Sequence, residues 1–154
     1  GSALNAKLEK KEYTTYCILG DGELNEGSIW EAAMSASHYN LDNLVAIVDR
    51  NRLQIDGCTS DVMKIEPLAS KWESFGWEVL KCNGHNIAEI LDCLNKADTI
   101  KDKPTVIIAT TIKGKCISYA EDVCGYHGIS PKDGLCGNES LEVALKDIGV
   151  SYFN

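Results

Sequence analysis

The chain has 154 residues, the size of one ordinary domain. It contains 15 Lys and Arg residues and 23 Asp and Glu residues, which gives a net charge of −8. This charge argues against binding to nucleic-acid phosphates or to an anionic membrane. No apolar run approaches the roughly 20 residues that a membrane span requires, and the first residues carry no secretory signal pattern.

Seven cysteines are scattered along the chain with no C-x-x-C pair among them. This spacing disfavours a zinc ribbon or a thioredoxin-like redox site. An odd number of cysteines, several of them inside apolar runs, is typical of reduced thiols. We therefore expect a cytoplasmic protein without disulfides.

Helices and strands are predicted to alternate from one end of the chain to the other. Apolar periodicity and β-branched runs predict, in chain order, a helix over 3–11, a strand over 14–19, a helix over 28–38, a strand over 44–48, a helix over 67–75, a strand over 77–81, a helix over 87–97, a strand over 105–110 and a helix over 141–148. In the clearest helix, Ile87, Ile90, Leu91 and Leu94 are predicted to share the buried face. A long segment over 112–137, rich in Gly and Cys, is predicted to be a functional loop. This order favours an α/β fold with a mostly parallel sheet flanked by helices.

The first strand is predicted to end in Gly20-Asp21-Gly22, ahead of a helix. Glycines let the backbone approach an anion closely, and the N-terminus of the following helix offers free N–H groups. Asp21 places a carboxylate at the same point. A carboxylate and an anion are compatible there if a divalent cation lies between them, as in magnesium–diphosphate sites.

A second polar turn, over 49–57, follows the next predicted strand. Asn51 offers a neutral amide oxygen, and the backbone carbonyl of Leu53 offers another oxygen ligand. Asp21 and Asn51 are 30 residues apart, the length of one strand–helix–strand crossover. Because the carboxyl ends of parallel strands meet at one edge, both turns can converge on one ion.

Taken together, these motifs resemble the thiamine diphosphate-binding domain of the transketolase family, in particular the N-terminal subunit of the split type. The similar segments are Gly20–Ala33, Asp49–Gly57, Asn83–Asn86, Thr110–Lys115 and Tyr126–Gly128. Asn86 stands where the family usually has Asp. The spacing of 14 residues from Lys113 to His127 also fits the family.

The resemblance implies a set of site residues. It implies that Asp21, Asn51 and the Leu53 carbonyl bind Mg²⁺, or Ca²⁺ or Mn²⁺ in its place, and that Gly22 and Glu23 lie along the diphosphate of thiamine diphosphate. It also implies that Ile55 and Ile112 pack near the thiazolium, that Lys113 and His127 face the diphosphate and the substrate channel, that His127 is a catalytic acid–base, and that Glu26 lies at a subunit interface.

The same resemblance implies transfer of a two-carbon ketol unit from a ketose phosphate to an aldose phosphate, within a homo- or hetero-oligomer. The pyrimidine-binding domain is expected in a C-terminal partner subunit, so residues 1–154 form a single diphosphate-binding domain that is incomplete on its N-terminal side and inactive alone. Two alternatives remain open. One is a fragment or regulatory remnant that folds without catalysis. The other is a different thiamine diphosphate enzyme: a deoxyxylulose-phosphate synthase, a dehydrogenase E1 component or a specialised sugar transketolase.

Overall fold

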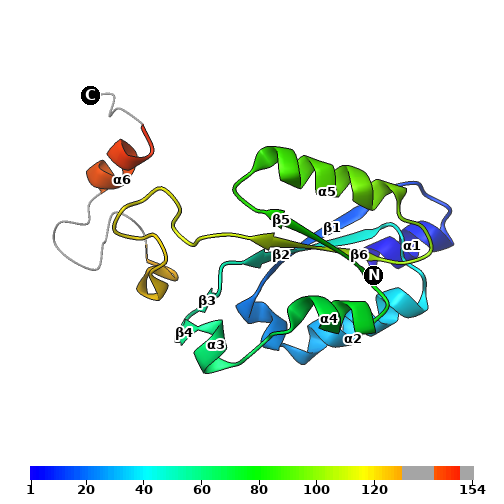
Figure 1. The fold of residues 1–154 in the computed structure, drawn as a ribbon. Coiled ribbons are helices and arrows are strands. Elements are labelled where there is room, and N and C mark those ends of the chain that lie inside the picture. Colours follow the sequence, from blue (N-terminus) through cyan, green and yellow to red (C-terminus); the bar gives the residue numbers. More distant parts are fainter. Residues whose placement is uncertain (130–140, 150–154) are drawn as a thin grey trace.

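Parallel strands form the central sheet of the computed structural model, which describes residues 1–129 and 141–149 (Figure 1). The strand order is β1–β2–β6–β5, with β1 at Thr15–Gly20, β2 at Leu44–Arg50, β6 at Thr105–Thr110 and β5 at Glu78–Asn83. Gly20 pairs with Asp49, and Asp49 pairs with Ala109. The carboxyl ends of neighbouring strands are therefore level with one another, and the predicted α/β fold with a parallel sheet is confirmed.

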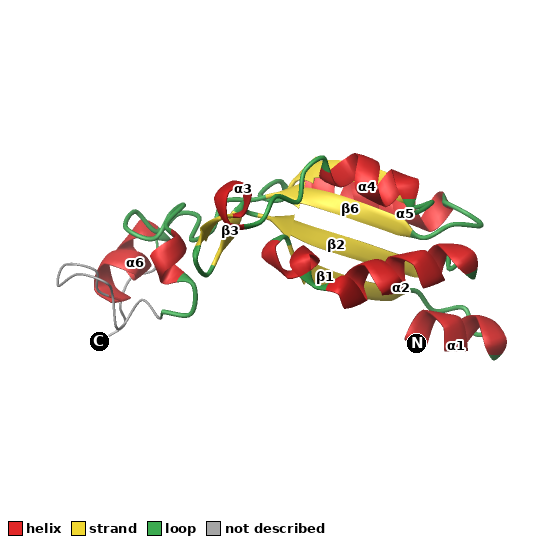
Figure 2. Cartoon of the chain, turned by 90° about the horizontal axis from the view of Figure 1, so that it is seen from below, coloured by secondary structure: helices red, strands yellow, loops and turns green. Residues whose placement is uncertain are grey.

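Helices cover both faces of the sheet. Helix α5 (Ile87–Thr99) lies on one face, whereas α2 (Gly27–His38) and α4 (Leu68–Ser74) lie on the other, as Figure 1 and the turned view in Figure 2 show. Helix α1 (Ser2–Leu8) precedes β1, and α6 (Leu141–Asp147) lies beyond the carboxyl ends of the strands. In the described part of the chain, no helix has the length and apolarity to cross a bilayer.

Tryptophans hold the larger of the two core clusters together. Trp72 of α4 is 1% exposed, and its ring centroid lies 5.2 Å from that of Trp30 in α2 and 4.8 Å from that of Trp77. The Trp77 indole N–H donates to the backbone carbonyl of Ala33 at 2.9 Å. A smaller cluster lies between α5 and the sheet, and it includes Cys93 and Ala97 of the helix and Cys82 of β5.

The predicted elements are all present where the structure describes the chain, with ends that shift by a few residues. β6 has the predicted bounds. Helix α1 ends at Leu8 instead of residue 11, since Lys10 has a left-handed φ of 54°. Pro67 lies just outside α4 as its N-cap, and Trp77 precedes β5.

The predicted buried face of α5 is wrong in part. Ile87 and Leu91 are 69% and 53% exposed, whereas Cys93 and Ala97 are buried and Ile90 and Leu94 are half-buried. The helix is rotated relative to the prediction because small residues at 93 and 97 let it pack closely on the sheet.

Short elements inside the predicted turns went unpredicted, since two to four residues carry no readable periodicity. They are η1 (Gly22–Asn25), β3 (Leu53–Gln54), β4 (Gly57–Cys58), α3 (Thr59–Val62) and η2 (Cys124–Tyr126). The long segment over 112–137 contains η2, and its part from 130 onward lies outside the described residues. Within the described part, the cysteines are free, as expected.

Candidate functional site

Asp21 joins the two predicted site loops. It follows β1 directly, and its side chain is almost fully buried, at 1% exposure. Its Oδ1 accepts a hydrogen bond from the Gly22 N–H at 2.9 Å, and its Oδ2 accepts one from the Arg52 N–H at 2.6 Å. The two predicted loops therefore meet at one edge of the sheet, and their convergence on one ion stays a prediction.

The charge on Asp21 is poorly compensated. Burial raises the pKa of this carboxyl, and neighbouring Asp49 raises it further, against the lowering effect of the Arg52 and Gly22 N–H groups and of Arg50. A bound divalent cation would favour the ionised form. Each carboxylate oxygen accepts one hydrogen bond and keeps a lone pair for a metal.

Asn51 and Leu53 shape the second loop. The Asn51 Oδ1 accepts a hydrogen bond from the Leu53 N–H at 3.0 Å, which closes a tight turn at the end of β2. Among the described residues, no group of three or more Asp, Glu, His or Cys side chains is placed to hold a metal. A donor set of one carboxylate, one amide oxygen and one carbonyl fits a hard cation that also takes phosphate oxygens, as Mg²⁺ does.

Gly22 and Gln54 bring the two loops into close contact. A Cβ on Gly22 would lie 2.9 Å from the Gln54 Cβ, so a side chain there would push the loops apart. The Gln54 Oε1 also accepts a hydrogen bond from the Asn25 side-chain amide at 3.3 Å. The Glu23 carboxylate accepts a hydrogen bond from the Gly20 N–H at 3.0 Å, so the Glu23 side chain folds back over its own loop.

A cavity of about 620 Å³ opens between the second loop and the end of β6. Asn51, Leu53 and Ile112 are among its lining residues, together with Arg50, Arg52 and Lys64. Ile55, on the β3–β4 turn, is 71% exposed and is not part of the lining. The structure thus brings one of the two predicted apolar residues to the cavity.

The other predicted residues lie outside this lining. Lys113 follows the end of β6, and its carbonyl accepts the Asp122 N–H at 2.9 Å. His127 is exposed directly after η2, and its backbone N–H donates to the Cys124 carbonyl at 2.9 Å. Glu26 is exposed and precedes α2.

Three side-chain contacts at this edge were not predicted. Arg50 at the end of β2 forms an ion pair with Glu66, with Nε 2.8 Å from Oε1. The Thr111 hydroxyl donates to Asp49, and the Ile112 N–H donates to His85. No spacing rule relates these partners. The strand order β2–β6–β5 brings Thr111 to Asp49 and His85 to Ile112, whereas Glu66 reaches Arg50 from the segment that precedes α4.

Comparisons with known proteins find a similarity to transketolases over nearly the whole chain. Residues 4–139 match the family described as transketolase, thiamine diphosphate binding domain. The chain is 44% identical over 148 residues to an apulose-4-phosphate transketolase subunit of Phocaeicola vulgatus, covering 96% of this chain and 51% of that protein. It is 43% identical over 129 residues to a 6-deoxy-6-sulfo-D-fructose transketolase subunit of Clostridium sp., covering 84% of this chain and 47% of that protein.

Longer transketolases are similar as well. Human transketolase is 43% identical over 129 residues, which cover 83% of this chain and 20% of that protein. The crystal structure of Campylobacter jejuni transketolase superposes with a TM-score of 0.83 at 30% identity, covering 97% of this chain and 23% of that one. The chain therefore spans about half the length of its subunit-type relatives and about a fifth of the human enzyme.

Proposed function

The chain belongs to the family of transketolase thiamine diphosphate-binding domains, and we propose that it binds the cofactor's diphosphate together with Mg²⁺, or Ca²⁺ or Mn²⁺ in its place. Residues 1–154 act as a single diphosphate-binding domain. The assembly to which they contribute transfers a two-carbon ketol unit from a ketose phosphate to an aldose phosphate.

The observation that carries this proposal is the position of Asp21. A nearly fully buried carboxylate accepts backbone hydrogen bonds from both loops, and its pKa is raised by burial. Burying a charge is costly unless it is paired. A cation held by Asp21, Asn51 and the Leu53 carbonyl would pair it and would attract a diphosphate to the same place.

The remaining residues have roles that suit this chemistry. When bound, thiamine diphosphate supplies the reactive thiazolium carbon that takes up the ketol unit. Gly22 lets the backbone approach the diphosphate, with Glu23 beside it, and Lys113 adds a positive charge. Ile112 and Ile55 offer apolar surface to the thiazolium. His127 holds or releases a proton at the substrate, and Glu26 contacts a neighbouring subunit.

A partner subunit is part of the proposal. The relatives from Phocaeicola vulgatus and Clostridium sp. are each named as one subunit of a transketolase, which supports the existence of a second. We assign to that C-terminal subunit the pyrimidine-binding domain, so that the active assembly is a homo- or hetero-oligomer acting on sugar phosphates. A cytoplasmic location agrees with the free cysteines of the described residues.

The names of two relatives favour one variation of this function. These proteins are named for sugars outside the common ketose phosphates, an apulose 4-phosphate and a 6-deoxy-6-sulfo-fructose. A specialised sugar transketolase is therefore the second candidate. A panel of ketol donors, assayed together with the partner subunit, separates these candidates. Activity on pyruvate without activity on any ketose would contradict both.

Calorimetric titration of thiamine diphosphate tests the binding proposal. We expect binding with Mg²⁺ and none with chelator, and we expect Asp21→Ala to weaken it at least about tenfold, or about 1.4 kcal/mol. Asp92→Ala on the exposed face of α5 removes the same charge away from the site and should bind as the wild type does. Thermal melts of each variant check the fold.

Two outcomes would count against the proposal. Binding that persists without any divalent cation would remove the role of Asp21, Asn51 and Leu53 as metal ligands. A wild type that binds no cofactor, alone or with the partner subunit, would favour the non-catalytic remnant instead.

A further inference from the structure

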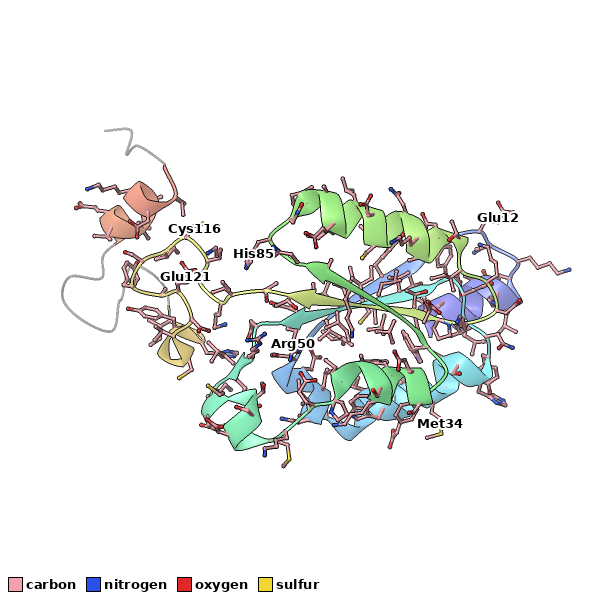
Figure 3. The ribbon with its side chains drawn as sticks, in the orientation of Figure 1. Glu12, Met34, Arg50, His85, Cys116 and Glu121 are labelled. Atoms are coloured by element: carbon pink, nitrogen blue, oxygen red, sulfur yellow. The ribbon has the colours of Figure 1, made fainter. Side chains whose placement is uncertain are left out.

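The chain leaves the sheet immediately after β6, and hydrogen bonds hold it at that point. The Thr111 N–H donates to the Arg50 carbonyl at 3.2 Å, and the Thr111 hydroxyl donates to Asp49. Both of these partners belong to β2. From the opposite side, the Ile112 N–H donates to Nε2 of His85 at 2.8 Å. Figure 3 shows His85 at the turn between β5 and α5, beside the segment that leaves β6.

The turn that carries His85 is rigidly built. The His85 N–H donates to the Asn83 side-chain oxygen at 2.9 Å, and the Glu89 carboxylate accepts the Asn83 N–H at 2.8 Å. Asn86 caps α5 by accepting the N–H groups of Ala88 and Glu89. The imidazole is therefore presented by a turn whose own backbone is fixed.

The same turn packs directly against the end of β6. The Gly84 N–H donates to the Thr110 carbonyl at 2.8 Å, and a Cβ on Gly84 would lie 2.4 Å from the Thr111 Cγ2. Any side chain at position 84 would therefore separate the turn from the segment. This close approach places His85 within reach of the Ile112 N–H.

The direction of the hydrogen bond defines the state of the ring. A neutral imidazole that accepts at Nε2 carries its proton at Nδ1. We propose that neutral His85 is a positioning residue that fixes Thr111–Lys113 against the cofactor site through the Ile112 N–H. The inference rests on the proposed function, because Ile112 and Lys113 are the residues assigned there to the cofactor. His85 acts through them.

Paired substitutions test this role. His85→Leu removes the acceptor, whereas His85→Gln offers an amide oxygen in its place. We expect His85→Leu to bind thiamine diphosphate with Mg²⁺ about three- to tenfold more weakly, the range for loss of a single hydrogen bond, and His85→Gln to recover most of the affinity. His38→Leu, at the exposed end of α2, is the matched control and should match the wild type.

Hydrogen exchange at the Ile112 amide gives a readout that does not depend on the cofactor. It should accelerate several-fold in His85→Leu and return toward the wild-type rate in His85→Gln. Wild-type-like affinity and exchange in His85→Leu would overturn this inference alone, as would equal weakening in both variants. Absence of binding by the wild type would overturn the proposed function, and the role toward the cofactor with it.

Discussion

At the scale of single residues, two glycines of one motif are expected to differ sharply. A Cβ at Gly22 meets the Gln54 Cβ at 2.9 Å, whereas a Cβ at Gly27 meets nothing within 4 Å. Gly22→Ala should therefore displace the two loops and weaken Mg²⁺-dependent cofactor binding about tenfold or more. Gly27→Ala lies in the first turn of α2 and should leave binding unchanged. Titration calorimetry on both variants makes the comparison, and equal affinities would contradict the close contact between the loops.

At the scale of elements, the packing of α4 and α5 can be compared with one type of substitution. Leu68 of α4 is 1% exposed and Leu91 of α5 is 53% exposed. Leu68→Ala should lower the free energy of unfolding by about 2–5 kcal/mol, because it leaves a cavity beside Trp72. Leu91→Ala should change it by less than about 0.5 kcal/mol. Urea denaturation measures both values. A large loss of unfolding free energy in Leu91→Ala would show instead that Leu91 is buried, as the periodicity alone predicts.

At the scale of the whole molecule, the described thiols differ in burial, and Cys124 lies between the exposed and the buried ones. Cys17, Cys58 and Cys116 are exposed, whereas Cys82 of β5 and Cys93 of α5 are buried where the helix packs on the sheet. Burial, with Cys93 alongside, raises the pKa of Cys82 to about 11. Since the thiolate is the reactive form, Cys82 should alkylate roughly a hundredfold more slowly than the exposed thiols near pH 8. Peptide mass mapping after iodoacetamide treatment, with a urea-unfolded control, measures this. Labelling of Cys82 at the rate of Cys58 would contradict the packing of α5.

The α/β class, the chain order of the main helices and strands, and the two turns that carry Asp21 and Asn51 can all be predicted from the amino-acid sequence. Local patterns suffice for these features. A β-branched run such as Thr105–Thr110 suits the pleated surface of a sheet and therefore predicts a strand. Glycine and Asp at the end of a strand predict a turn with a charge at a known sheet edge.

Which side chains meet at that edge depends on how the segments pack in three dimensions. The burial of Asp21, the contact of Gly22 with Gln54 and the hydrogen bond from Ile112 to His85 each join segments that are distant in sequence. The same is true of α5, whose buried face depends on how closely Cys93 and Ala97 approach the sheet. Local patterns miss these contacts because periodicity reflects only the average environment of a segment. Contacts between segments depend on strand order and on side-chain volumes that no local pattern contains.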